Sequence, residues 1–286
     1  MSTDQEQDRA AAAIADPAAA GAEAVLEGLN ESQRAAVTHL GGPLLIVAGA
    51  GSGKTRTLTR RFEWLVRSGV PADRILALTY TKDAAGELAE RIEHALGEQV
   101  EDTSAATFHS LCINVLRDEA AAARLNPFFT TATGPDRVAI MLARINELSF
   151  DRLALRGNPA GVIGELLELI DRLKEECAGP EELRRYAEAA LADAVDPDAR
   201  AQAELLSEQA EFYAHHEQFL REAGALDFGG MQFEMYKLLT ADEAVRRRIA
   251  RRWDHVLVDE LQDTSYVQLE ILRLLCMDHR NIAAVG

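Results

Sequence analysis

Residues 44–55 read LLIVAGAGSGKT, an apolar run followed by a loop of small residues that ends in Lys-Thr. The apolar run predicts a buried strand, and residues 56–67 predict a helix after the loop. In this arrangement backbone N–H groups surround a phosphate, Lys54 adds a positive charge and the Thr55 hydroxyl suits Mg²⁺. We interpret residues 48–55 as a P-loop that binds a nucleoside triphosphate. The alternative, a Gly-rich turn that only opens a helix, is disfavoured by the ordered succession of strand, loop, Lys-Thr and helix.

A second, acidic element narrows the class of nucleotide-binding protein. Residues 256–258, Val-Leu-Val, predict a short buried parallel strand, and Asp259 and Glu260 follow at its carboxyl end, where ligands of open α/β sheets bind. We expect Asp259 to hold Mg²⁺, directly or through water, and Glu260 to orient and deprotonate an attacking water. A solvated acidic strand end is the alternative, and the presence of the P-loop argues against it.

The residues after this acidic pair resemble a helicase motif. Residues 259–264, Asp-Glu-Leu-Gln-Asp-Thr, are similar to the DExxQD box of superfamily 1 helicases of the UvrD/PcrA/Rep type, which include RecB-like helicase-nucleases. Residues 29–33, Leu-Asn-Glu-Ser-Gln, resemble the Q-motif of this family, in which a glutamine amide reads the adenine edge. The resemblance implies that Gln33 selects adenine, and that Gln262 and Asp263 link the nucleotide pocket to the DNA face.

These motifs together define the expected ATP and Mg²⁺ site. The predicted nucleotide-binding residues are Gln33, Ala48, Gly49, Ala50, Gly51, Ser52, Gly53, Lys54, Thr55 and Arg56. The predicted catalytic residues are Lys54, Glu260 and Gln262, and the predicted Mg²⁺ ligands are Thr55 and Asp259. Ala48 departs from the usual glycine, which is tolerable if its backbone needs no positive φ.

Two further stretches resemble the DNA-binding motifs of the family. Residues 78–88 are similar to motif Ia and residues 106–111 match motif Ib. Within motif Ia, Lys-Asp replaces the usual Asn-Lys pair, so the positive charge is shifted by one position. Core packing is the alternative for the aromatic residues Tyr80 and Phe108. The resemblance implies contacts to single-stranded DNA from Tyr80, Thr81, Lys82, Thr107 and His109.

Pattern changes along the chain predict four segments. Residues 1–28 combine many alanines with six acidic residues and one arginine, which predicts a disordered tail. Strand and helix patterns alternate over residues 29–121, which predicts the first part of an α/β, P-loop NTPase (RecA-like) parallel sheet, and residues 226–286 return to that sheet. Residues 122–225 show helical periodicity without strand signals, so we expect an all-helical insertion, like the inserted subdomain of the family called 1B.

The return to the sheet is where the match weakens most. Residues 226–228, Leu-Asp-Phe, resemble the re-entry sequence of the family, Leu-Asp-Phe-Asp-Asp-Leu. Gly229 and Gly230 replace the polar part of that sequence.

The net charge of −17 is unevenly distributed. Residues 165–223 hold sixteen acidic and six basic side chains, which we interpret as a solvated helix face rather than a site. His215 and His216 in this segment are expected at the surface rather than as metal ligands. Residues 54–94 hold eight basic and six acidic side chains, so a near-neutral motor with local basic strips can still follow a DNA backbone, with salt-sensitive affinity.

The composition indicates a cytoplasmic globular protein. Its 48% hydrophobic residues suffice for a sizeable core. The scattered cysteines Cys112, Cys177 and Cys276 predict buried, reduced thiols. No apolar run approaches the roughly 20 residues that cross a bilayer, and the N-terminus has no basic start before an apolar stretch, so we expect neither membrane insertion nor secretion.

The resemblance also implies an activity and its partners. Residues 281–286 resemble the strand that opens motif III, so the rest of that motif and the second motor domain with its arginine fingers are expected to be absent. The family implies ATP hydrolysis that drives 3′-to-5′ movement on single-stranded DNA in replication, repair or recombination. The isolated half is expected to turn over very slowly, and a second helicase half or partner chain is expected to complete it. The alternative is a catalytically idle ATP- or DNA-binding fragment that regulates or pairs with a complete helicase.

Overall fold

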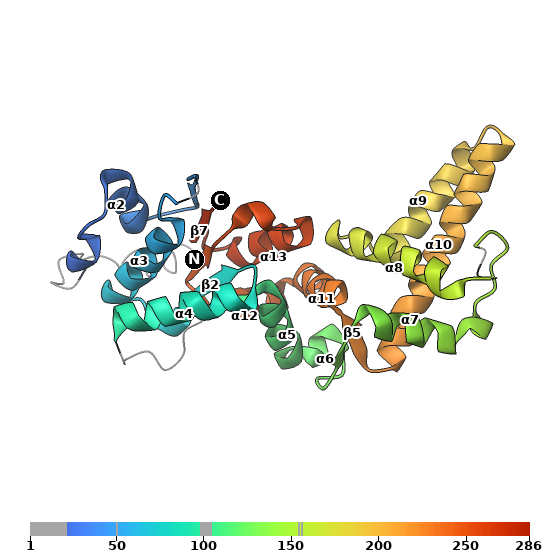
Figure 1. Ribbon diagram of the computed structural model, residues 1–286, viewed down its shortest axis with the longest axis horizontal. Coiled ribbons are helices and arrows are strands. Elements are labelled where there is room, and N and C mark those ends of the chain that lie inside the picture. The colour runs from blue at the N-terminus through green and yellow to red at the C-terminus, as the bar shows by residue number, and fades with distance from the viewer. Residues whose placement is uncertain (1–21, 50, 98–104, 154, 156) are drawn as a thin grey trace. The chain divides into compact units, whose positions relative to one another are not determined.

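The computed structural model describes residues 22–49, 51–97, 105–153, 155 and 157–286, and these form two compact units (Figure 1). The first unit comprises the described residues of Met1–Leu111 together with Leu239–Thr264 and Ile271–Gly286. The second comprises Cys112–Leu238 and Ser265–Glu270. The compact units divide the chain after Leu111 and after Leu238. They therefore do not test the segment boundaries at 121/122 and 225/226, which stay predictions.

A five-stranded parallel sheet forms the centre of the first unit. Its strands are β1 (Leu44–Ile46), β2 (Ile75–Thr79), β3 (Ala105–Thr107), β6 (His255–Val258) and β7 (Ile282–Val285). They lie in the order β1-β7-β6-β2-β3, and every neighbouring pair is parallel. All carboxyl ends therefore meet at one edge of the sheet, which is where parallel α/β sheets bind ligands.

Helices follow the strands as the alternating pattern predicts. The first-unit helices are η1 (Ala24–Leu26), α2 (Glu31–Thr38), α3 (Lys54–Arg67), η2 (Ala72–Arg74), α4 (Lys82–Leu96), α12 (Glu243–Ala250) and η4 (Leu261–Asp263). Three helices have residues in both units, α5 (Phe108–Asp118), α11 (Phe228–Ala241) and α13 (Tyr266–Cys276). Phe62 and Leu65 of α3 and Leu88 of α4 pack with Ile75 of β2 in one core. Each such side chain contributes roughly 1.5–3 kcal/mol on full burial.

The N-terminal boundary of this core corrects one prediction. Residues 22–28 were expected to belong to the disordered tail, but Ala22 and Val25 are each 1% exposed and pack in the same core as Phe62. The apolar residues Val25 and Leu26 close an alanine-rich stretch, and their contribution is hidden when the composition of residues 1–28 is averaged. Residues 1–21 lie outside the described residues.

The second unit consists mainly of helices. They are α6 (Ala120–Ala123), α7 (Gly134–Ala143), η3 (Ile145–Glu147), α8 (Pro159–Glu175), α9 (Pro180–Asp193), α10 (Pro197–Glu222) and α11 (Phe228–Ala241), of which the last extends beyond the unit. Helices α8, α9 and α10 each begin with a proline, whose missing N–H costs nothing at that position. Figure 1 shows α9 and α10 side by side as a hairpin. Ile163 and Leu167 of α8 pack with Phe212 and Phe219 of α10.

The prediction of an all-helical insertion needs one correction. Strand β4 (Thr130–Ala132) pairs in parallel with β5 (Ala225–Asp227), which forms a small second sheet in this unit. Strands of three residues are too short to show the two-residue alternation that marks a strand in sequence. The α/β class of the chain is confirmed.

A cluster of buried charges joins the helices of the second unit. Lys174 of α8 is 0% exposed, and its Nζ lies 2.7 Å from Glu217 Oε1 and 2.8 Å from Asp227 Oδ2. Arg137 of α7 adds a second cation, because its Nε lies 3.3 Å from Asp227 Oδ2. Asp227 also accepts a hydrogen bond from the Gly230 N–H at the start of α11. The Asp227 carboxylate therefore connects β5, α8 and α11.

This cluster explains why glycine replaces the polar residue at position 230. A Cβ atom on Gly230 would lie 2.8 Å from Asp227 Oδ1 and 3.3 Å from Lys174 Nζ. We expect Gly230→Ala to lower the free energy of unfolding by about 1–3 kcal/mol, because the methyl group overpacks a buried ion pair. Urea unfolding followed by circular dichroism measures this loss.

Gly164→Ala provides the matched control for that measurement. Gly164 lies in α8, and a Cβ there meets nothing within 4 Å. Alanine should therefore stabilise the helix by roughly 0.5–1 kcal/mol. Equal effects of the two substitutions would contradict the steric explanation.

Candidate active site

The two predicted nucleotide-binding loops meet at the carboxyl edge of the five-stranded sheet. The P-loop follows β1, Asp259 and Glu260 follow β6, and β7 lies between these two strands. Gly286, at the end of β7, donates its N–H to the Ile46 carbonyl and accepts from the Ala48 N–H, both at 3.1 Å. The backbone of β7 thus connects the acidic strand to the first residue of the P-loop. Ala48 is not among the described residues with positive φ, which explains why alanine is tolerated there.

The P-loop backbone is curved by two glycines. Gly51 has φ 77° and Gly53 has φ 84°, a left-handed conformation in which a side chain would be strained. The Ser52 N–H donates to the Gly49 carbonyl at 3.2 Å, which closes the turn. Ala50 lies outside the described residues. Helix α3 begins directly after Gly53, so the positive end of its dipole faces the loop.

The predicted catalytic and metal-binding side chains come together in one cluster. Lys54 Nζ lies 3.6 Å from Glu260 Oε2, with 19% and 40% of the two side chains exposed. The Thr55 hydroxyl donates to Asp259 Oδ2 at 3.2 Å. Gln262 Nε2 donates to Glu260 Oε2 at 2.5 Å. Residues more than 200 positions apart in sequence therefore converge as the motifs predict.

Burial raises the pKa of the Asp259 carboxyl, the predicted Mg²⁺ ligand. Asp259 is 7% exposed, and desolvation raises its pKa above the ordinary aspartate value. The neighbouring Glu260 carboxylate raises this pKa further, whereas the Thr55 hydroxyl and the Lys54 charge lower it. Thr55 and Asp259 offer the hydroxyl and carboxylate oxygens that Mg²⁺ prefers, and the charge of such a cation would offset the cost of burying the carboxylate.

Glu260 has a strained backbone that no sequence pattern indicated. Its φ of 54° is in the left-handed region, which costs a non-glycine residue roughly 1–2 kcal/mol. Its N–H donates to Asp259 Oδ1 at 3.1 Å. Such strain concentrates at functional sites. Here it accompanies the placement of the Glu260 carboxylate beside Lys54.

Gln33 lies at the P-loop, as the Q-motif resemblance implies. Its Nε2 donates to the Ser52 carbonyl at 3.1 Å, and its Oε1 accepts from the Asn30 N–H at 3.1 Å. Both ends of the amide are therefore held, and each retains capacity for one further hydrogen bond. Arg56 is exposed, and its Nη2 donates to the Gly28 carbonyl at 3.3 Å. A direct contact between Arg56 and the nucleotide stays a prediction.

The predicted motif Ia residues lie at the carboxyl end of β2. Tyr80 is 57% exposed and Lys82 is exposed, so both side chains are accessible to a ligand. The Thr81 hydroxyl accepts from the Ala84 N–H at 3.1 Å and thereby caps α4. Thr81 thus has a structural role, and its contact with DNA stays a prediction.

The predicted motif Ib residues Thr107 and His109 lie at and just after the carboxyl end of β3, which neighbours β2 in the sheet. Thr107 is 5% exposed, and its hydroxyl lies 3.1 Å from Ser110 Oγ, so its side chain contributes to the turn rather than to an open surface. His109 is partly buried, and burial together with the Lys82 charge lowers its pKa. Phe108 is 4% exposed, which supports core packing for this aromatic residue.

Comparison with known proteins decides the family. The profile of the UvrD/REP helicase N-terminal domain matches residues 29–286. The chain belongs to this family. It is 39% identical over 263 residues to ATP-dependent DNA helicase UvrD1 of Mycobacterium tuberculosis, which covers 91% of the chain and 32% of the relative. It is 36% identical over 254 residues to UvrD1 of Mycobacterium leprae, with 88% and 30% covered.

The chain is also similar to helicases named PcrA. ATP-dependent DNA helicase PcrA of Bacillus subtilis is 32% identical over 263 residues, which covers 92% of the chain and 33% of PcrA. The chain therefore spans about a third of the length of the curated relatives that it matches.

Among the described residues, no helix is both long enough and apolar enough to span a bilayer.

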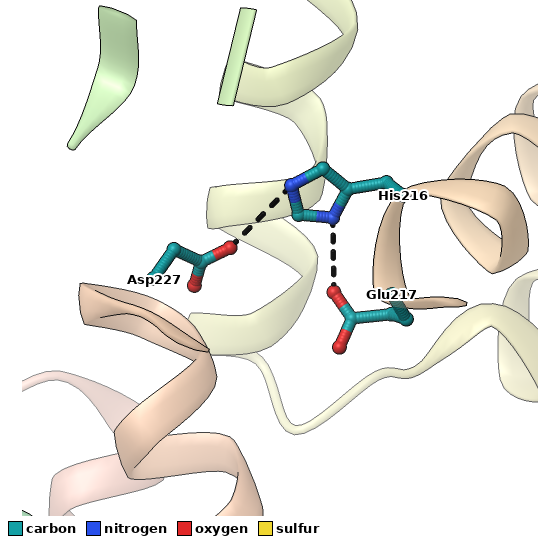
Figure 2. Close-up of side chains that lie close together, drawn as sticks. All are labelled: His216, Glu217 and Asp227. Atoms are coloured by element: carbon teal, nitrogen blue, oxygen red, sulfur yellow. Dashed lines mark hydrogen bonds and ion pairs between the residues drawn. The ribbon is translucent and has the colours of Figure 1, made fainter. Parts of the chain in front are cut away.

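This UvrD/REP-family chain holds a second group of potential metal ligands in its other unit. His216, Glu217 and Asp227 offer ligand atoms within 4.8 Å of one another. Figure 2 shows the His216 ring between the two carboxylates, with one nitrogen facing each. Arg137 Nε donates to His216 Nε2 at 3.1 Å, so Nδ1 carries the proton and donates to Glu217 at 3.0 Å. Lys174 binds both carboxylates. We interpret this group as an ion-pair network rather than a metal site.

His216 also corrects a prediction. It was expected at the surface, but it is 0% exposed, and burial lowers its pKa so that the ring stays neutral. In sequence the neighbouring His215 has the same appearance, yet its side chain is 28% exposed. Helix geometry separates them, because adjacent residues point about 100° apart around the axis.

The sequence motifs did not reveal the close approach of Gly286 to Gln262, one of the predicted catalytic residues. A Cβ there would lie 3.2 Å from Gln262 Oε1 and 3.6 Å from the Gln262 backbone nitrogen. Any larger residue would displace the side chain that holds Glu260. The only signal in the sequence is the resemblance of residues 281–286, which end in Gly286, to the strand that opens motif III.

Proposed function

We propose that this chain is the ATP-binding half of an ATP-dependent DNA helicase that moves 3′-to-5′ on single-stranded DNA in replication, repair or recombination. The observation that carries the proposal is the convergence of Lys54, Thr55, Asp259 and Glu260 at one sheet edge. The names of the UvrD1 and PcrA relatives support the reaction class. Retention of the whole set disfavours an idle regulatory fragment, which needs no Glu260. A cytoplasmic location stays a prediction.

The proposed roles follow from the chemistry of each group. The P-loop N–H groups and Lys54 bind the phosphates, while Thr55 and Asp259 hold Mg²⁺. When bound, Mg²⁺ neutralises charge on the phosphate oxygens. Glu260 orients the attacking water and accepts its proton. Gln262 holds the Glu260 carboxylate through the hydrogen bond at 2.5 Å.

Lys54 changes partners in this proposal. It lies 3.6 Å from Glu260 in the structure, and a bound triphosphate offers it a stronger anion. Transfer of the Lys54 charge to the phosphates leaves the Glu260 carboxylate available to water. Nucleotide binding itself thereby prepares the general base.

Single-stranded DNA is the proposed polymer substrate. Tyr80 and Lys82 are accessible at the edge that also carries the nucleotide loops, since β2 and β6 are neighbouring parallel strands. A base stacked on Tyr80 would contribute about 1–3 kcal/mol, and Lys82 would pair with a backbone phosphate. The second motor half, from the same or another chain, is the proposed partner.

Binding of Mg²⁺-ATP to the purified chain tests the site. We expect Lys54→Met to weaken binding of a fluorescent ATP analogue about 10- to 100-fold, because it removes a charge-assisted contact of roughly 1.5–3 kcal/mol. Lys237→Met is the control, since Lys237 is 43% exposed and belongs to the second unit. Failure of the unmodified chain to bind ATP, or equal weakening by both substitutions, would rule out this site.

A further inference from the structure

Arg61 is a buried cation of the P-loop helix α3 that no motif explains. It is 4% exposed and lies beneath the carboxyl end of α2, which packs beside α3 (Figure 1). Its Nη1 donates to the carbonyl groups of Ala36, Val37 and His39 at 2.9, 3.1 and 3.0 Å. One guanidinium nitrogen thus binds the last carbonyls of α2.

Carbonyl groups at the end of α2 stabilise the Arg61 charge. Burial lowers the pKa of Arg61 to about 10. It therefore remains protonated at neutral pH. The carboxyl end of a helix carries partial negative charge, so α2 provides the counter-dipole that this cation needs.

Helix α2 depends on such contacts for its position. It has eight residues, and isolated helices shorter than about 12–15 residues are marginal in water. Its first turn is ordered by the capping box between Asn30 and Gln33. Its last turn is held by Arg61. These two sets of contacts, at opposite ends, place the Gln33 amide.

Helix α3 holds the chain on both sides of α2. Arg56, near its start, donates to the Gly28 carbonyl before α2, and Arg61 holds the other end. The same helix begins at the P-loop, and Gln33 Nε2 donates to the Ser52 carbonyl within that loop at 3.1 Å. The phosphate loop and the glutamine amide therefore share one support.

We propose that Arg61 is a positioning residue for base recognition, which sets the Gln33 amide at the place where an adenine edge lies when the triphosphate occupies the P-loop. The inference rests on the proposed ATP-binding function. Arg61 itself lies beneath α2 and acts through it. Its loss should change the choice of base more than the binding of phosphate.

The test compares affinities for Mg²⁺-ATP, Mg²⁺-GTP and inorganic tripolyphosphate by isothermal titration calorimetry. We expect Arg61→Met to reduce the preference for ATP over GTP about tenfold, with affinity for tripolyphosphate within about twofold of the unmodified chain. Gln33→Ala should have the same effect on the preference. The double variant should lose no more than Gln33→Ala alone, because both changes act on one contact.

Arg60→Met is the matched control. Arg60 is the preceding residue of α3, has a side chain 33% exposed and pairs with Glu63 at 2.7 Å. It should leave both preference and affinity unchanged. Arg61→Lys keeps the charge but offers fewer donors, so about a threefold loss of preference is expected, and this variant decides the question if Arg61→Met does not fold.

Several distinct results would overturn the proposal. Equal weakening of all three ligands by Arg61→Met would show a general structural role, and an unchanged ATP preference would show no role in base choice. Independent losses in the double variant would separate Arg61 from Gln33. An unmodified chain that binds tripolyphosphate but does not prefer ATP would refute this inference alone, whereas one that binds none of the ligands would refute the ATP site as well.

Discussion

Glu260→Gln is expected to slow ATP hydrolysis by about 10²- to 10⁴-fold and to leave ATP affinity nearly unchanged. The amide has the size of the carboxylate but cannot accept the proton of the attacking water. Glu260 is well placed for this role, because its carboxylate is 40% exposed and is held by Gln262 and Lys54. Loss of the negative charge beside Lys54 should slightly favour phosphate binding.

Phosphate release with single-stranded DNA present measures this effect, with the second motor domain of a family member supplied in trans. Glu181→Gln is the control, since Glu181 has a side chain 59% exposed and pairs with Arg184 on the surface of α9. An unchanged hydrolysis rate in the Glu260→Gln variant would show that Glu260 is not the general base. Parallel losses of rate and affinity would indicate that the substitution disrupts the P-loop instead.

Lys174→Met should destabilise the second unit by about 3–5 kcal/mol, because it leaves Asp227 and Glu217 buried without their main cation. Burial alone would raise the pKa values of both carboxyl groups, but the Lys174 charge holds them below the ordinary values. Arg137 remains near Asp227 at 3.3 Å and compensates only in part. Hydrogen exchange of α8 and α10 amides measures the loss where it occurs.

The pH dependence of this effect has a defined sign. In the unmodified chain the folded-state pKa values of the two carboxyl groups are depressed, so their contribution is present above the unfolded values near 4 and falls below them. Without Lys174, burial should raise the folded pKa values above the unfolded ones, so the buried charges destabilise the fold increasingly as pH rises. The gap between the two proteins should therefore be largest at neutral pH and shrink below about pH 4.

Two variants separate this explanation from simple loss of packing. Arg184→Met removes a cation of α9 that is 58% exposed and whose partner Glu181 is 59% exposed, so it should change stability little. Addition of Glu217→Gln to Lys174→Met should recover part of the lost stability, because one uncompensated charge is removed. No recovery in the double variant would show that packing, rather than charge, accounts for the loss.

The local structure around the candidate active-site residues was predictable because their motifs act over short stretches. The P-loop needs glycines at positions of positive φ, and Gly51 and Gly53 have them. The acidic pair needs a strand before it, and β6 ends one residue before Asp259. Parallel strands then bring separate loops to one edge, so the contact between Lys54 and Glu260 followed from chain direction and fold class.

Long-range partners were not predictable in this way. The burial of His216 beside Lys174 and Arg137 depends on how α7, α8 and α10 pack, and periodicity alone leaves their rotations open. The acidic composition of residues 165–223 indicated a solvated face, and one of its members, Glu217, lies in the core of the ion-pair network. A count of charges cannot distinguish a paired carboxylate from a solvated one.

The amino-acid sequence by itself determined the nucleotide loops, the acidic strand end and the UvrD/REP resemblance, since each depends on residue types at fixed spacing and on local backbone requirements. Only the tertiary structure decided that Arg61 anchors α2, that Lys174 neutralises two buried carboxylates and that Glu260 has positive φ. The physical reason is that these features arise from desolvation and from donors that meet acceptors far away in the chain. These interactions contribute to stability only after the helices have packed.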